Sequence, residues 1–292
     1  MKFLFEPFLD NEFLRHALYA GILVSLICAV AGTFVVLRGL AFVGDALAHG
    51  VLPGIATALI LGVSGVFGAM VGAAVMMGGV NVVTRKLRLT GDTSVGLLFV
   101  GMLALGVIIT SRSQSFSGDL TRILFGQLLG VAWSQLVWQA VAFVVVATTA
   151  WVCRRPFLLL CVDDGLTESS GFSVRKFHAI MLTLVAITIV ASFQTVGTLL
   201  VLGMLIAPSA TGALVSRRLS TMIIVAAVCG SIATYVGLLL SYHADLAASA
   251  TIVLSAVVLF AVTAVARGFR DFLRRASRSD EELPHQHTHI HV

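Results

Sequence analysis

Asp45 and His49 are residues whose types and spacing suit metal chemistry. They stand four positions apart, in Asp45-Ala-Leu-Ala-His49, near the start of an apolar run. On a helix this spacing puts both side chains on one face, where they can share a ligand. A carboxylate and an imidazole together suit Zn²⁺, Mn²⁺ or Fe²⁺. The alternative is an ion pair that ties two helices together.

The surroundings of this pair favour a path for ions. An ionised aspartate inside a bilayer costs roughly 2.5–3.5 kcal/mol on insertion scales, so it is rarely found there without a partner. Pro53 and Gly54 follow, and we expect them to break the helix. Interrupted helices in membranes tend to line cavities or substrate sites. The pair also suits a proton relay in a proton-coupled secondary carrier.

A second set of imidazoles lies at the C-terminus. The last eight residues carry a histidine at every second position, directly after an acidic cluster at 280–282. Neutral imidazoles bind late first-row metals, and a flexible tail can wrap around one. The pattern predicts transient metal binding by His285, His287, His289 and His291.

Composition places these residues in a membrane. The 292 residues are 58% hydrophobic and 11% charged, with a mean hydropathy of +1.02. A soluble domain is nearer a quarter charged, so an ordinary globular enzyme is excluded. Runs of about 20 apolar residues can cross a hydrocarbon core of about 30 Å. We predict an all-α, polytopic bundle embedded in membrane lipid, with spans near residues 16–37, 42–61, 66–84, 93–110, 134–152, 177–196, 199–215, 221–242 and 247–266.

The number of spans is eight or nine. Residues 177–215 form one apolar stretch in which only Gln194, Thr195 and Gly197 suggest a turn. Pro208, near its end, predicts a hinge or a kinked span.

The distribution of the basic residues predicts which parts of the chain face the cytosol. The formal net charge is +5, from 19 Lys and Arg against 14 Asp and Glu. With nine spans and an outside N-terminus, fifteen of the nineteen basic residues fall on the cytosolic side, together with the C-terminus. The surplus therefore needs no nucleic acid to explain it. We divide the chain into an N-terminal segment (1–15), a transmembrane domain (16–266) and a cytosolic basic, His-rich tail (267–292).

The cytosolic segment 153–176 is the main polar interruption of the transmembrane domain. Thr167 or Asp164 is suited to cap a brief helix that ends at Gly171. Such a helix either docks a partner protein or forms part of a solvated loop. The chain holds no GxxxxGK[ST] phosphate loop, so we expect a transport subunit without an ATPase site of its own rather than an enzyme.

Several of these motifs resemble the permease (membrane) subunit of zinc-, manganese- and iron-type metal-ion ABC importers. The most specific is Phe42-Val-Gly-Asp-Ala-Leu-Ala-His49, preceded by Gly32-Thr-Phe-Val-Val-Leu-Arg38 and followed by Val51-Leu-Pro-Gly54. The likeness runs from about residue 13 to 266. It continues at residues 123–130, 171–176, 196–201, 208–211, 242–245 and 250–254.

The resemblance implies a homodimer of permeases in the bacterial cytoplasmic membrane that works by alternating access. Two cytosolic ABC ATPase subunits would energise it, and an extracytoplasmic metal-binding protein or lipoprotein would deliver the ion. Asp45 and His49 would hold Zn, Mn or Fe briefly, with no tightly bound cofactor. The segment around Glu168 and Gly171 matches the position of the coupling helix, which docks on the ATPase. The chain departs from the family at 245–249, where relatives often carry Pro and Gly.

Overall fold

The computed structural model describes residues 11–87, 91–111, 126 and 128–281. Over these ranges the chain is helical, without strands, and nine segments are long and apolar enough to cross a membrane. This confirms the all-α, polytopic fold. The helices are α2 (Glu12–Arg38), α3 (Ala41–Gly50), α4 (Leu52–Ile60), α5 (Gly65–Leu87), α6 (Gly91–Ser111), η1 (Leu128–Gly130), α8 (Trp133–Val152), α9 (Arg154–Val162), α10 (Asp164–Ser169), α11 (Val174–Val215), α12 (Leu219–Ala244) and α13 (Ala248–Glu281).

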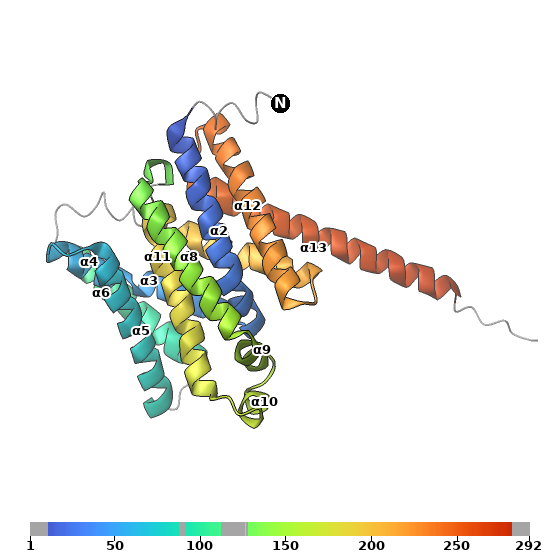
Figure 1. Ribbon diagram of the computed structural model, residues 1–292, viewed down its shortest axis with the longest axis horizontal. Coiled ribbons are helices and arrows are strands. Elements are labelled where there is room, and N and C mark those ends of the chain that lie inside the picture. The colour runs from blue at the N-terminus through green and yellow to red at the C-terminus, as the bar shows by residue number, and fades with distance from the viewer. Residues whose placement is uncertain (1–10, 88–90, 112–125, 127, 282–292) are drawn as a thin grey trace, which may run out of the picture.

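Helices α2 and α11 form the centre of the bundle. They pack on each other, and both contact α8 and α12. In the most apolar part of α2, 72% of the residues are buried, against 22% in the corresponding part of α6. Figure 1 shows the two central helices between the group α4 to α6 on one side and α12 and α13 on the other. The helix that carries Asp45 and His49, α3, contacts both α6 and α11.

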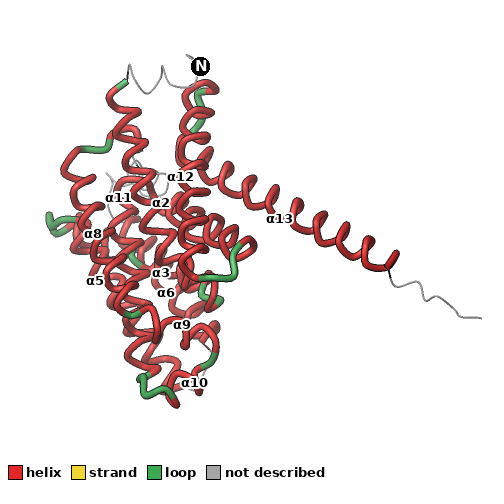
Figure 2. Tube along the Cα trace, turned by 45° about the vertical axis from the view of Figure 1, so that its right-hand side comes forward, coloured by secondary structure: helices red, strands yellow, loops and turns green. Residues whose placement is uncertain are grey.

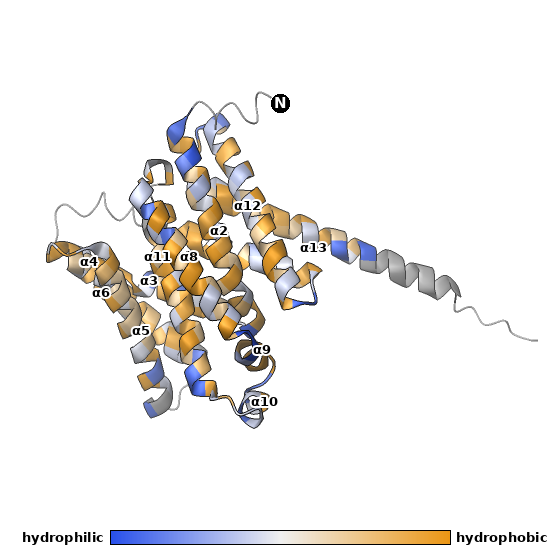
Figure 3. Cartoon of the chain, viewed as in Figure 1, coloured by the Kyte–Doolittle hydropathy of each residue, from blue (hydrophilic) through white to orange (hydrophobic). Residues whose placement is uncertain are grey.

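The outer surface is apolar along most of the bundle. Large side chains such as Leu61, Trp138 and Val152 are at least 70% exposed. Figure 3 shows hydrophobic residues along the helices, and hydrophilic ones at the lower end of α5 and at the start of α9. In lipid such a surface carries no cost, and helices associate through close packing instead. The protein is therefore a multi-pass membrane protein.

Helix α11 holds two crossings, and the first runs antiparallel to α8. Near the start of α8, Gln139 donates a hydrogen bond to the hydroxyl of Thr195, late in this crossing. Near the end of α8, residues 145–149 lie beside residues 179–187 of α11. In the direction in which residue numbers increase along α8, they decrease along this part of α11, so the two helices are antiparallel.

The second crossing runs parallel to α2. Cys28 lies 3.9 Å from the carbonyl oxygen of Val201, and four residues further along both helices Gly32 lies against the backbone of Leu205. Helices α2 and α8 run in the same direction, since their N-terminal ends meet where the rings of His16 and Trp133 stand 5.9 Å apart. The two halves of α11 therefore run in opposite directions.

Gly197 makes this reversal. Its φ of 77° and ψ of 165° are not helical, and this region of backbone space is essentially open to glycine alone. Nine crossings follow for the described residues, which resolves the count that hydropathy leaves open. Pro208 lies inside the second half and does not end it.

The last helix extends past the span expected to end at residue 266. Helix α13 continues to Glu281 and contacts α11 and α12. Figures 1 and 2 show its C-terminal part leading away from the bundle. The predicted tail thus begins as helix. Its four alternating histidines lie outside the described residues.

Candidate functional site

Asp45 and His49 lie on α3, in the second crossing. This crossing, Ala41–Ile60, is divided at Val51, where α3 ends and α4 begins. The expected interruption is therefore present, and it lies just before Pro53. Pro53 occupies the first turn of α4, where a missing backbone N–H leaves no helical hydrogen bond unmade. His49 thus sits in the last turn of α3, near the middle of the crossing.

The two side chains lie close enough for one ion to contact both. His49 Nε2 lies 3.6 Å from Asp45 Oδ1, and the side chains are 24% and 38% exposed respectively. Metal bonds of about 2.1 Å at a tetrahedral angle put two donor atoms about 3.4 Å apart. The observed separation fits that geometry, and it is longer than a good hydrogen bond.

Helix α6 holds the imidazole from the side. The ring of Phe99 meets His49 edge to face, with 5.8 Å between the ring centres, and it meets Phe42 at 6.3 Å. Phe42 and His49 both lie on α3, so the ring of Phe99 lies across the face of α3 that carries Asp45 and His49. No sequence pattern links residue 99 to residue 49, and Phe99 was not identified beforehand.

The described residues offer two candidate ligands here. Among the residues that the structure describes, no three His, Cys, Asp or Glu side chains gather closely enough to hold a metal ion. A closed four-ligand cage is typical of structural metal sites, whereas open positions let a ligand exchange. Two donors with free positions therefore suit an ion that must enter and leave.

The predicted cytosolic helix exists, but its N-cap is a different residue. Helix α10 spans Asp164–Ser169, and Asp163 Oδ1 accepts a hydrogen bond of 2.9 Å from the backbone N–H of Leu166. Asp163 has extended backbone angles, so it lies just outside the helix, whereas Asp164 is already within its first turn. The hydroxyl of Thr167 donates to the Asp163 carbonyl instead. Both expected caps, Asp164 and Thr167, are therefore wrong.

The predicted end of this helix is confirmed at Gly171. Its φ of +82° is left-handed, and its N–H donates to the carbonyl of Glu168 at 3.0 Å. The N–H of Phe172 donates to the carbonyl of Thr167 at 3.1 Å, which completes a Schellman motif. Glu168 and Gly171 are both exposed, so they can touch a partner protein.

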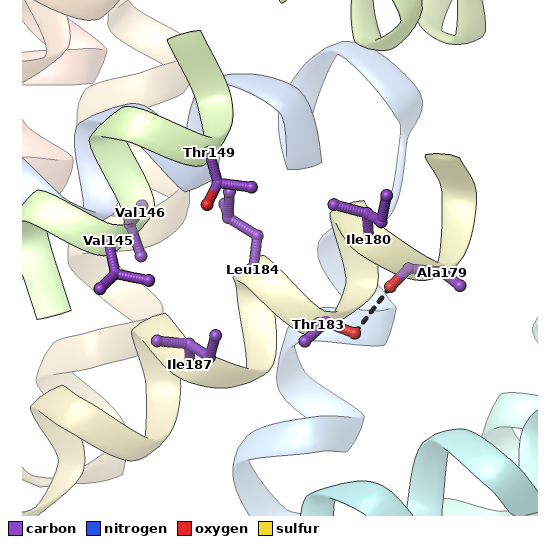
Figure 4. Close-up of a pocket in the computed structure, with 8 residues that line it drawn as sticks. All are labelled: Val145, Val146, Thr149, Ala179, Ile180, Thr183, Leu184 and Ile187. Carbon is purple, nitrogen blue, oxygen red and sulfur yellow. Dashed lines mark hydrogen bonds between the residues drawn. The ribbon is translucent and has the colours of Figure 1, made fainter. Parts of the chain in front are cut away.

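A pocket of about 260 Å³ between α8 and α11 differs from the Asp45–His49 pair in the chemistry of its side chains (Figure 4). It is lined mostly by aliphatic side chains, and its polar side chains are the hydroxyls of Thr149 and Thr183. The Thr183 hydroxyl already donates to the carbonyl of Ala179 at 2.8 Å. This lining lacks the carboxylate and imidazole donors of the Asp45–His49 pair.

In the part of the chain that the structure describes, nine apolar segments, one of which carries a carboxylate–imidazole pair, are typical of a multi-pass membrane protein such as a permease. The model of the ABC 3 transport family matches residues 10–267. The chain belongs to this family, which confirms the resemblance found in its motifs.

Relatives of known name cover nearly the whole chain. The manganese transport system membrane protein MntC of Halalkalibacterium halodurans is 36% identical, over 90% of each chain. The chelated iron transport system membrane protein YfeD of Yersinia pestis is 35% identical, over 89% of this chain and 87% of its own. The solved structure of PsaBC from Streptococcus pneumoniae in complex with Fab matches with a TM-score of 0.81 and 31% identity. It covers 89% of this chain and 94% of its own.

Proposed function

We propose that the protein is the permease subunit of an ABC importer that moves Zn, Mn or Fe ions across the bacterial cytoplasmic membrane. The observation that carries this proposal is the separation of 3.6 Å between His49 Nε2 and Asp45 Oδ1 within a membrane crossing. Relatives named for manganese and for iron transport support the choice of cargo. Family membership favours an ATP-driven importer over the proton-coupled carrier.

Asp45 and His49 hold the ion in transit. Water, the delivering protein or a second permease copy supplies the remaining coordination positions. Because one carboxylate and one imidazole suit all three metals, selectivity depends on delivery and availability as much as on affinity. Alternating access then opens the pair first to the outside and next to the cytosol.

The partners follow from the same assignment. A cytosolic ABC ATPase docks at α10, where Glu168 and Gly171 are exposed, and supplies the energy that this chain does not generate itself. An extracytoplasmic metal-binding protein or lipoprotein delivers the ion, and a second copy completes a homodimer in the lipid. The N-terminus lies outside and the C-terminus in the cytosol. There, His285, His287, His289 and His291 act as a sink or sensor for arriving metal.

Growth of a bacterial strain that lacks its own metal uptake systems tests the proposal. The chain is expressed with its ATPase and binding protein, and growth is measured with limiting Zn²⁺, Mn²⁺ or Fe²⁺ in turn. Rescue of growth by at least one metal is expected, and short-term uptake of that metal should stop when the cells are depleted of ATP. Uptake that survives ATP depletion but collapses with the proton gradient would instead identify the carrier.

A further inference from the structure

Arg38, the last residue of α2, joins two parts of the molecule that are far apart in sequence. Its guanidinium donates a hydrogen bond of 2.8 Å to Asp164 Oδ1, at the start of α10, 126 positions further along the chain. The same guanidinium also donates to the backbone carbonyl of Leu160 on α9. One side chain therefore holds both helices of the cytosolic segment.

An aromatic contact supports this connection from inside the bundle. The rings of Phe34 on α2 and Phe157 on α9 meet edge to face, with 5.1 Å between their centres. Both side chains are at most 1% exposed. The cytosolic end of α2 and the α9–α10 segment are therefore packed against each other, and Arg38 ties them at the surface.

On the C-terminal side of Arg38, the chain continues through a short turn into α3, the helix that carries Asp45 and His49. Gly39 ends α2 with a φ of 69°, and its N–H donates to the carbonyl of Val36 while that of Leu40 donates to Val35. Helix α3 begins at the next residue. These hydrogen bonds close the turn between α2 and α3. A displacement of Arg38 is therefore passed on to the first turn of α3.

We propose that Arg38 is the positioning residue that links the ATPase-docking segment to the metal path, by tying α10 to the start of α3. The inference rests on the proposed function, because it requires an ATPase at α10. The Asp164 side chain is 59% exposed, and exposed ion pairs stabilise proteins little. Stability is therefore not the main consequence of this contact. Arg38 donates to Leu160 and Asp164 at once, through separate nitrogens of its planar fork, whereas lysine has a single nitrogen for both.

The test measures metal imported per ATP hydrolysed, in proteoliposomes that contain the full complex of permease and ATPase and are supplied with the metal-binding protein. The variants are Arg38→Gln, Asp164→Asn and the double variant, with Arg155→Gln as control because it removes an exposed arginine from the start of α9. Both single variants should lower the ratio about fivefold or more, the usual lower range of coupling between sites. ATPase association should stay at the wild-type level.

The double variant should be no worse than the poorer single variant, because both changes remove the same bond. Arg38→Lys should recover part of the ratio. An unchanged ratio in Asp164→Asn, whose exposed side chain leaves folding intact, would overturn the inference. An equal loss in Arg155→Gln would also overturn it. If the wild type imports no metal with ATP, the proposed function itself fails. If the wild type imports and the variants match it, only the role of Arg38 fails.

Discussion

The backbone of Gly54 in α4 lies directly against the backbone of Gly68 in α5. A Cβ on Gly54 would stand 2.1 Å from the carbonyl oxygen of Gly68, and a Cβ on Gly68 would stand 2.3 Å from that of Gly54. Glycines in membrane helices allow this closeness, and the contact falls at Pro53-Gly54 of the family-specific motif. The second half of the crossing that carries Asp45 and His49 is thereby fixed to α5.

Gly54→Val should separate these helices and destabilise the protein. Backbone atoms cannot rotate away as a side chain can, so the added atoms force the two helices apart. Overpacking of this kind costs about 1–3 kcal/mol. The measurement is the thermal unfolding temperature in detergent. Gly78→Val, in α5, is the matched control. Nothing lies within 4 Å of the Cβ position of Gly78, so this variant should be near neutral. Equal unfolding temperatures for the two variants would contradict the prediction.

Loss of either member of the metal pair should abolish uptake. Asp45→Asn replaces the charged carboxylate by a weaker, neutral amide and His49→Ala removes the imidazole. The uptake rate should fall at least about tenfold, since losing even an outer partner of a metal ligand costs 10–100-fold. Metal uptake by whole cells or right-side-out vesicles measures this. His243→Gln is the control, because it removes an exposed imidazole from the far end of α12. Normal uptake by a correctly inserted His49→Ala protein would refute the metal path.

Replacement of Gly171 should impair the docking segment through its backbone. Nothing lies within 4 Å of a Cβ at this position, so the strain comes from the φ of +82° and amounts to about 1–2 kcal/mol for an L-residue. Gly171→Val should therefore lower uptake. Gly171→Asn, similar in volume but tolerant of left-handed angles, should retain most of it. ATPase association and uptake are measured together. Wild-type values for Gly171→Val would contradict this role.

The thiol of Cys161 should react slowly at neutral pH. Burial raises the pKa of this thiol, and the positive charge of Arg38 partly opposes the rise. Only the thiolate reacts, and each pH unit below the pKa lowers its fraction about tenfold. Alkylation followed by mass spectrometry should therefore accelerate with pH, through and beyond the ordinary thiol pKa of about 8.5.

The same alkylation experiment reports the position of Arg38. Arg38→Gln removes the charge that lowers the pKa, so alkylation of Cys161 at a fixed pH should slow further. Arg155→Gln should leave the rate unchanged. An equal change in both variants would show that the guanidinium of Arg38 does not act on this thiol.

Much of this molecule is visible in its sequence. Long apolar runs define crossings by length alone, because each must satisfy its own backbone hydrogen bonds in lipid. The spacing of Asp45 and His49 places them on one face before any coordinates exist. Gly171 ends a short polar helix in the sequence as in the structure.

Other features depend on distant contacts or on exact backbone angles. The pairing of Arg38 with Asp164 and the packing of Phe99 on His49 join residues that no local pattern relates. Asp163, rather than its neighbour Asp164, caps α10 because of its extended backbone. Likewise, hydropathy cannot distinguish one long helix from two crossings, since the single residue that reverses the chain, Gly197, is not polar.

That reversal has a consequence for how the chain enters the membrane. As one straight helix, the 42 residues of α11 would extend about 63 Å, twice the thickness of the hydrocarbon core. Folded back at Gly197, both halves fit within it, and no hydrophilic loop separates them. The two crossings therefore have no aqueous segment to be translocated between them during biosynthesis. We therefore expect the two crossings to enter the bilayer together, as one hairpin.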